Sequence, residues 1–191
     1  MTPTAAERGA STRRQLLQAT ATVIARDGWG AVTTRRVAEQ AGVNAGLVHY
    51  HFTSVDDLRR QATLAALEHV LAPVIARLDS ASDLRETLEV LLRGLDSIDP
   101  EVPEVALLYE AFLAAFREDA IRAELGGALR GFRRHVADLL RHAGAEDPDD
   151  LAALVAAAID GILLHTLVDP DLDPTRIVGP LGRLLPSGGR P

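Results

Sequence analysis

Apolar positions recur at helical spacing along most of the chain, and no stretch shows the two-residue alternation of a β-strand. In the N-terminal third this pattern predicts helices over 12–26, from 33 or 34 to 41, over 44–52 and from 54 to about 72, where Pro73 would break or kink the last one. Beyond a polar interval it predicts helices over 82–95, 104–117, 119–142 and from 148 onward, then a short turn near 175–184 in a tail rich in proline and glycine. The chain is therefore expected to be all-α.

The segment from Thr33 to Phe52 predicts two short helices joined by a tight turn. Thr33 or Thr34 can cap the first helix with a side-chain oxygen. Gly42 stands just past its last apolar position, where a helix ends most easily with positive φ, and Asn44 can cap the second helix. This pattern is typical of a helix-turn-helix, whose second helix enters the major groove of DNA.

The second helix of this pair has two distinct sides. Val48, His51 and Phe52 share the inward side, so His51 is expected to be a packed imidazole. The outward side carries small residues first and aromatic hydrogen-bonding residues behind them: Ala45, Gly46, His49 and Tyr50. Such a face suits the major groove, where the N-terminal part of a recognition helix meets the base edges.

These residues belong to a set of motifs by which the chain resembles the tetracycline-repressor (TetR) family of bacterial transcription regulators. The motifs lie between about residues 12 and 60, and beyond them the resemblance is one of helical layout. They are Ala25-Arg26-Asp27-Gly28-Trp29, then Thr33-x-x-x-Val37-Ala38-x-x-Ala41-Gly42-Val43, then Tyr50-His51-Phe52-x-Ser54 and Asp56-Asp57-Leu58.

The resemblance implies an N-terminal helix-turn-helix domain of three helices, here residues 1–55, and a C-terminal helical domain for ligand binding and dimerisation, here 56–191. It also implies a homodimer built through the C-terminal helices, where small residues would allow close contact. The alternative is that these are ordinary core helices, and the dimer is the favoured interpretation. A two-fold dimer would read two half-sites of a double-stranded operator.

The net charge of −7 is unevenly distributed. Residues 1–60 carry eight arginines against five acids, a net +3, whereas the remainder carries twelve arginines against twenty-two acids, a net −10. This asymmetry is consistent with DNA docking at one end of the chain, and also with an ordinary solvated surface.

Eight residues are the candidates for DNA contacts. Those expected to position the phosphates are Thr34, Arg35, Asn44, Tyr50 and Thr53, and those expected at base edges are Ala45, Gly46 and His49. Arg36 is either a further contact or an ordinary surface arginine. The family commonly has lysine near positions 53 and 55, where this chain has Thr53 and Val55, and Arg13 and Arg14 could compensate. Trp29 is expected to fill the core of the three-helix unit.

A small-molecule effector of unknown identity is expected in the C-terminal domain. Apolar residues that could line its pocket, with polar anchors, are Leu67, Leu71, Leu88, Leu92, Leu108, Tyr109, Phe112, Phe116, Phe132 and His165. An aromatic stripe at helical spacing is also what an ordinary core requires.

Composition narrows the other classes of function. Without cysteine the chain forms no disulfide and performs no thiolate chemistry. Asp160 and His165 are five positions apart and poorly aligned on a helix, so no metal or cofactor site is expected. Apolar runs look too short and too often interrupted by charge to span a bilayer, and the N-terminus does not resemble a signal peptide, so a cytoplasmic protein is expected.

The leading hypothesis is a ligand-responsive DNA-binding regulator, specifically a repressor released from its operator by a small apolar or amphipathic effector. The second is a helix-turn-helix regulator controlled by a protein partner or by no ligand. The third, an enzyme on a helical scaffold, requires a convergent polar site that the sequence does not show.

Overall fold

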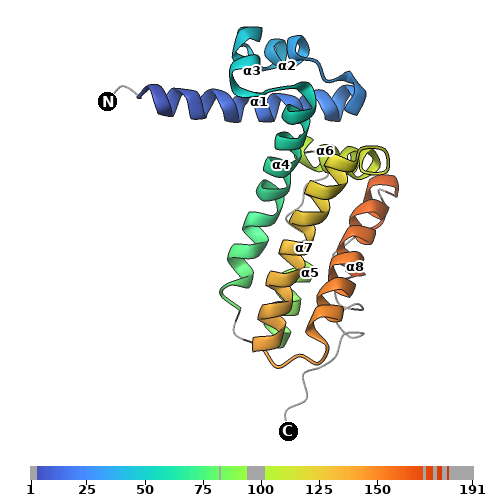
Figure 1. The fold of residues 1–191 in the computed structure, drawn as a ribbon. Helices are drawn as coiled ribbons and strands as arrows, with labels where there is room; N and C mark the ends of the chain where they lie inside the picture. The colour runs from blue at the N-terminus through green and yellow to red at the C-terminus, as the bar shows by residue number, and fades with distance from the viewer. Residues whose placement is uncertain are drawn as a thin grey trace. The chain divides into compact units, whose positions relative to one another are not determined.

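The computed structural model describes residues 4–81, 83–93, 102–169, 171–173, 176–177 and 180. Every regular element among these residues is a helix, as the apolar spacing predicts (Figure 1). The chain forms two compact units, which we call unit 1 (residues 1–69 and 101–126) and unit 2 (residues 70–100 and 127–191).

Unit 1 begins with α1 (Ala5–Asp27), a short 3-10 turn η1 (Trp29–Ala31), α2 (Thr34–Ala41) and α3 (Ala45–His51). It also contains the first part of α4 (Val55–Leu78), all of α6 (Pro103–Ala114) and the first turns of α7 (Asp119–His142). Within it α2 packs against both α1 and α3, and α1 also packs against α6 (Figure 1). Apolar side chains from these helices are fully buried, among them Leu16, Val23, Ile24, Val37, Val48, Phe52 and Leu58.

Helix α1 starts at Ala5, seven residues before the position that the apolar pattern predicts. Thr4 and Glu7 form a capping box, in which the Thr4 hydroxyl accepts from the Glu7 N–H and the Glu7 carboxylate accepts from the Thr4 N–H. The apolar pattern misses this first part because its side chains are mostly exposed. Gly28, with φ 86°, ends the helix as expected.

Helix α4 runs through Pro73 to Leu78, so the prediction of an end near Ala72 is wrong. An interior proline costs a helix about 3 kcal/mol. Val74 and Leu78 follow it and are buried in the core of unit 2, and burial of a large apolar side chain contributes about 1.5–3 kcal/mol. Tertiary packing of the last turn therefore offsets the local preference of the proline.

Unit 2 contains the rest of α4 and α7, with α5 (Leu84–Arg93) and α8 (Pro148–Val168). Its core gathers residues from all four helices: Val74, Leu78, Leu91, Val136, Ala137, Leu140, Leu151, Ala152 and Val155. The predicted bounds of α7 and the start of α8 are confirmed, and Gly144 ends the turn between them with φ 80°. Most of the helical turn predicted over 175–184 lies outside the described residues.

Helix α8 is apolar on two sides. Leu151, Val155 and Ile162 are buried, whereas another group of large apolar side chains is exposed: Leu154, Leu164, Leu167 and Val168. By length and composition this helix could cross a membrane, with a mean hydropathy of 2.1, so the expectation that every apolar run is too short is wrong for α8. A helix with one side in a core and the other against a second protein has the same composition.

Candidate nucleic-acid interface

The turn between α2 and α3 is fixed by local hydrogen bonds. The Thr33 hydroxyl caps α2 by accepting from the Arg36 N–H at 3.2 Å. Gly42 takes a left-handed conformation with φ 66°, and the Val43 N–H returns to the Ala38 carbonyl at 3.0 Å. Asn44 Oδ1 then accepts from the Gly46 N–H at 2.8 Å and caps α3. The predicted helix-turn-helix geometry is confirmed at each of these residues.

Helix α3 presents nearly all of its side chains to solvent. Within it only Val48 is buried, while Ala45, Gly46, His49 and Tyr50 are exposed, Tyr50 by 79%. His51 is half-buried with ring contacts to Tyr50 and Phe52, as its inward position predicts. The outward face of α3 is therefore available to a nucleic acid.

Leu47 is an exposed residue of α3 that the sequence reasoning missed. It follows Gly46 in the first turns of the helix, where a recognition helix meets base edges. An apolar side chain there suits the C5-methyl group of thymine. In the sequence, Leu47 can be recognised as a large apolar residue that lies outside the helical spacing of the positions expected to be buried.

Three exposed arginines of α1 and α2 are already paired with acids. Arg35 Nε lies 2.8 Å from Glu39 Oε1, and this hydrogen bond raises the pKa of Arg35. Arg26 lies 2.8 Å and Arg36 3.7 Å from the same carboxylate oxygen of Asp27. The hydrogen bond from Arg26 is the main reason why the pKa of Asp27 is lowered, even though desolvation opposes it. A phosphate would have to compete with these carboxylates.

Arg13 also has internal partners. Its guanidinium donates to Gln61 Oε1 on α4 and lies 5.7 Å from the centre of the Phe52 ring. The role of Arg13 in compensating for missing lysines stays a prediction, because its remaining N–H groups are still available to a phosphate. Arg14 is exposed and remains a candidate for that role.

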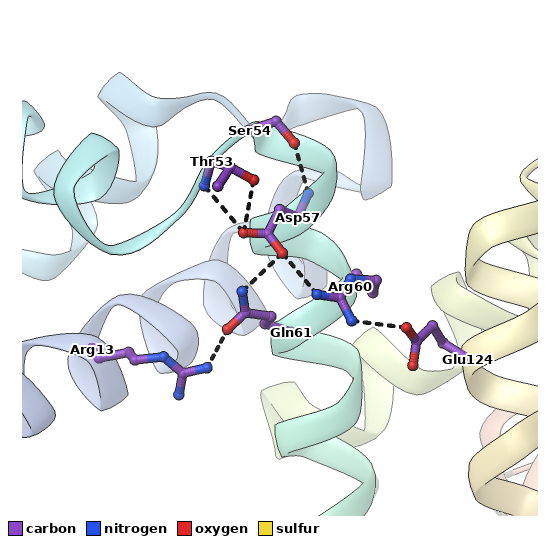
Figure 2. Close-up of polar contacts among 7 residues, drawn as sticks. All are labelled: Arg13, Thr53, Ser54, Asp57, Arg60, Gln61 and Glu124. Atoms are coloured by element: carbon purple, nitrogen blue, oxygen red, sulfur yellow. Dashed lines mark hydrogen bonds and ion pairs between the residues drawn. The ribbon is translucent and has the colours of Figure 1, made fainter.

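Asp57 is the centre of a hydrogen-bond network at the corner between α3 and α4 (Figure 2). Its Oδ2 accepts from the Thr53 N–H at 3.1 Å and from the Thr53 hydroxyl at 3.2 Å, and its Oδ1 accepts from Gln61 at 2.8 Å and from Arg60 at 2.9 Å. These donors, the Gln61 amide first, lower the pKa of Asp57 to about 2 against the opposing effect of desolvation. The carboxylate is therefore ionised at neutral pH and accepts every one of these bonds.

Trp29 does not fill the three-helix core, so that prediction is wrong. It packs instead beside Ala111, Ala114 and Ile121, residues of α6 and α7. Its indole Nε1–H donates to Glu118 at 2.8 Å, and its backbone N–H donates to Glu110 at 3.2 Å. The expectation failed because it considered only helices adjacent in sequence, whereas the hydrogen-bond partners of Trp29 lie more than eighty residues away.

The residues predicted to line an effector pocket have different environments. Leu67 and Leu108 are buried, and Leu71, Tyr109 and Phe132 are half-buried. Phe112, Phe116 and His165 are exposed, Phe116 by 82%, and the side chains of Leu88 and Leu92 lie outside the described ones. The pocket stays a prediction, and Leu67 and Leu108 are the most enclosed of its members whose side chains are described. Within the described part of the chain, no three histidine or acidic side chains are grouped to hold a metal ion.

Two family models together cover most of the chain. Residues 16–62 match the model for bacterial regulatory proteins of the tetR family, and residues 79–187 match the tetracyclin repressor-like C-terminal domain. The first match spans the C-terminal half of α1, all of α2 and α3, and the beginning of α4.

Comparison with individual relatives and solved structures leads to the same family. The HTH-type transcriptional regulator BetI of Rhizobium meliloti is 30% identical over 155 residues, which cover 80% of this chain and 76% of the relative. A TetR-family structure from Streptomyces coelicolor has a TM-score of 0.76 at 30% identity and covers 92% of this chain and 99% of its own. The multidrug binding protein EbrR complexed with imidazole has a TM-score of 0.71 at 29% identity and covers 98% of each chain. This chain therefore belongs to the tetR family of bacterial transcriptional regulators.

Proposed function

We propose that the protein is a homodimeric repressor that binds a two-fold symmetric operator through α3 and is released by a small apolar or amphipathic effector. The observation that carries the proposal is the exposed face of α3, held on a capped helix-turn-helix. Ala45, Gly46 and His49 would meet base edges, and Thr34, Arg35, Asn44 and Tyr50 would position phosphates. Thr53 is treated separately below because its hydroxyl is bonded to Asp57.

Two substitutions on α3 separate base reading from phosphate positioning. Tyr50→Phe removes one exposed hydroxyl from each protomer. It should weaken binding to all duplexes by a similar factor, about 3–10 for each half-site and so about 10–100 for the dimer. His49→Ala should change the sequence preference, with little effect on random DNA.

The experiment selects duplexes from a random-sequence library with the wild-type protein and repeats the selection with each variant. Affinities for the selected duplex and for a scrambled duplex of equal length then give the discrimination. An equal effect of His49→Ala on both duplexes would exclude the proposed role of His49. Failure of the wild-type protein to enrich any sequence would exclude operator reading by this protein.

The assembly and the effector are supported by two observations. The exposed apolar side chains of α8 suit a second copy of the chain. EbrR is named for multidrug binding, and its similarity to this chain favours an apolar or amphipathic effector here. Loss of operator binding on addition of such compounds tests release. If none acts, the favoured alternative is a regulator controlled by a protein partner or by no ligand.

A further inference from the structure

We infer that Asp57 positions the C-terminal end of α3 for operator reading, and that Thr53 serves this positioning instead of donating a hydrogen bond to a phosphate. The inference rests on the proposed function, since it concerns how the DNA-reading helix is held. It concerns the corner formed by Phe52, Thr53 and Ser54 between α3 and α4 (Figure 2).

Hydrogen bonds in both directions close this corner. The Ser54 hydroxyl accepts from the Asp57 N–H at 3.0 Å and caps α4. The Asp57 carboxylate reaches back and accepts both donors of Thr53, the N–H and the hydroxyl, on the single oxygen Oδ2. The arrangement resembles a capping box, except that the acid binds the residue before the cap. A rotation of the corner would break three hydrogen bonds together.

The other carboxylate oxygen extends the network to two further helices. Oδ1 accepts from Gln61 and Arg60, and these residues connect to Arg13 on α1 and to Glu124 on α7, the latter at 2.8 Å (Figure 2). The Asp57 side chain is only 16% exposed. Because all of these residues lie in unit 1, the corner is tied to several parts of one compact body.

Helix α3 depends on such anchoring because it is short and little buried. A helix of seven residues is unstable alone, and Val48 is the only one of its residues that is buried. Its start is held by Asn44, whereas its end is held by buried Phe52 and by the Asp57 network. His49 and Tyr50 lie in its last turn, so a displacement of that turn moves both residues directly.

The chemistry of Thr53 excludes it as a phosphate donor in this arrangement. A hydroxyl has one hydrogen, and an ionised carboxylate can only accept, so the Thr53 hydrogen is directed to Asp57. The Thr53 hydroxyl oxygen then presents only lone pairs to its surroundings. The negatively charged oxygens of a phosphate are repelled by these lone pairs. A phosphate contact would require Thr53 to leave a charge-assisted hydrogen bond.

The experiment uses the full chain, a duplex selected by the wild-type protein from a random library, and a scrambled duplex of equal length. Binding is measured over a series of salt concentrations for Asp57→Asn, Thr53→Val, Thr53→Ser and the double variant Asp57→Asn with Thr53→Val. Asp56→Asn is the matched control, because it removes the same charge from the adjacent residue, whose side chain is 80% exposed. Circular dichroism and urea titration give the folded fraction of each variant.

We expect Asp57→Asn to weaken binding to the selected duplex about tenfold. Binding to the scrambled duplex should be unchanged, or slightly stronger because one negative charge is lost. Thr53→Val should act in the same direction, Thr53→Ser should keep wild-type discrimination, and the double variant should be no worse than Asp57→Asn. Thr53→Val should leave binding to the scrambled duplex unchanged. Asp56→Asn should change both duplexes equally.

Two results would overturn the inference. If Asp57→Asn weakens binding to both duplexes only in proportion to its unfolded fraction, Asp57 stabilises the fold and does not position α3. If Thr53→Val, corrected for its folded fraction, weakens binding to the selected and the scrambled duplex by the same factor, Thr53 binds phosphate, because contacts to the DNA backbone carry no sequence information. Should Asp57→Asn fail to fold, the Thr53→Val and Thr53→Ser pair still decides. Absence of any sequence enriched by the wild type is a different result, since it contradicts the proposed function itself.

Discussion

Arg35 and Glu39 form an exposed ion pair one helical turn apart on α2, next to the proposed recognition helix. Exposed pairs of this kind contribute only about 0.2–1 kcal/mol, so a phosphate can take the arginine from its partner at small cost. We therefore expect Glu39 to lower the affinity of the protein for DNA, both by holding Arg35 and by its own charge.

We expect Glu39→Gln to strengthen binding to selected and scrambled duplexes alike, by roughly two- to fivefold. Fluorescence anisotropy at constant salt measures both affinities. Glu68→Gln is the control, since it removes the same charge from an exposed position of α4 in unit 1. Equal gains from the two substitutions would mean that Arg35 is not held back by Glu39.

At the residue scale, the sequence predicts contacts that span a few positions and misses those that span many. Thr33, Gly42 and Asn44 act on residues two to four positions away, so their roles follow from local rules of helix capping. Trp29 and Arg13 have partners that only the folded chain brings near. The local interpretation therefore misses the partners of both residues.

At the scale of elements, the turn between α2 and α3 depends on a backbone conformation that glycine adopts most easily. Gly42 has φ 66°, with open space where a Cβ would lie. Gly42→Ala should therefore lower the free energy of unfolding through backbone strain, by about 1–2 kcal/mol. Urea unfolding measures this loss.

Gly30 provides the matched control for this turn. A Cβ at Gly30 would also lie in open space, and its φ lies outside the left-handed range. Gly30→Ala should leave stability nearly unchanged or raise it slightly, because alanine restricts the unfolded chain. Equal stabilities of the two alanine variants would contradict a requirement for glycine at the turn.

The helix ends show how far element bounds follow from sequence. The bounds of α7 and the start of α8 are predictable because Gly144 and Pro148 are local signals. The start of α1 escapes the apolar pattern because its first turns bury little and are held by the Thr4–Glu7 capping box. The end of α4 escapes it because burial of Val74 and Leu78 outweighs the local effect of Pro73.

The contact between Trp29 and Glu118 joins η1 to the start of α7 within unit 1. We expect Glu118→Gln to preserve it, because an amide oxygen can accept the indole N–H, and Glu118→Ala to destabilise the protein by about 1–3 kcal/mol. Trp29 is the one tryptophan of the chain, so its fluorescence reports this contact directly. A shifted emission for Glu118→Ala with wild-type emission for Glu118→Gln is the expected result, and identical spectra for both would contradict it.

At the scale of the whole molecule, the distribution of charge and of exposed apolar surface suggests that DNA binding and assembly use different parts of the chain. Residues 1–60, which carry the proposed DNA-reading face, are net positive in an acidic chain. The large exposed apolar side chains of α8 lie in unit 2. The family resemblance predicts an assembly role for this helix, but the sequence does not separate its core positions from its exposed ones, because both are apolar and only the fold distinguishes them.

Dimerisation through α8 can be tested by placing a charge on its exposed apolar side. Leu164 is 53% exposed, so Leu164→Glu should be tolerated in the single chain and should oppose a second copy, since burial of an unpaired carboxylate is costly. Light scattering should then give the mass of one chain instead of two. A single chain reads one half-site, so the slope of log K against log salt should fall to about half of the wild-type value.

Phe116→Glu, a charge at an exposed apolar position of unit 1, should leave both measurements unchanged. A dimeric Leu164→Glu protein with an undiminished salt slope would place the dimer contact elsewhere.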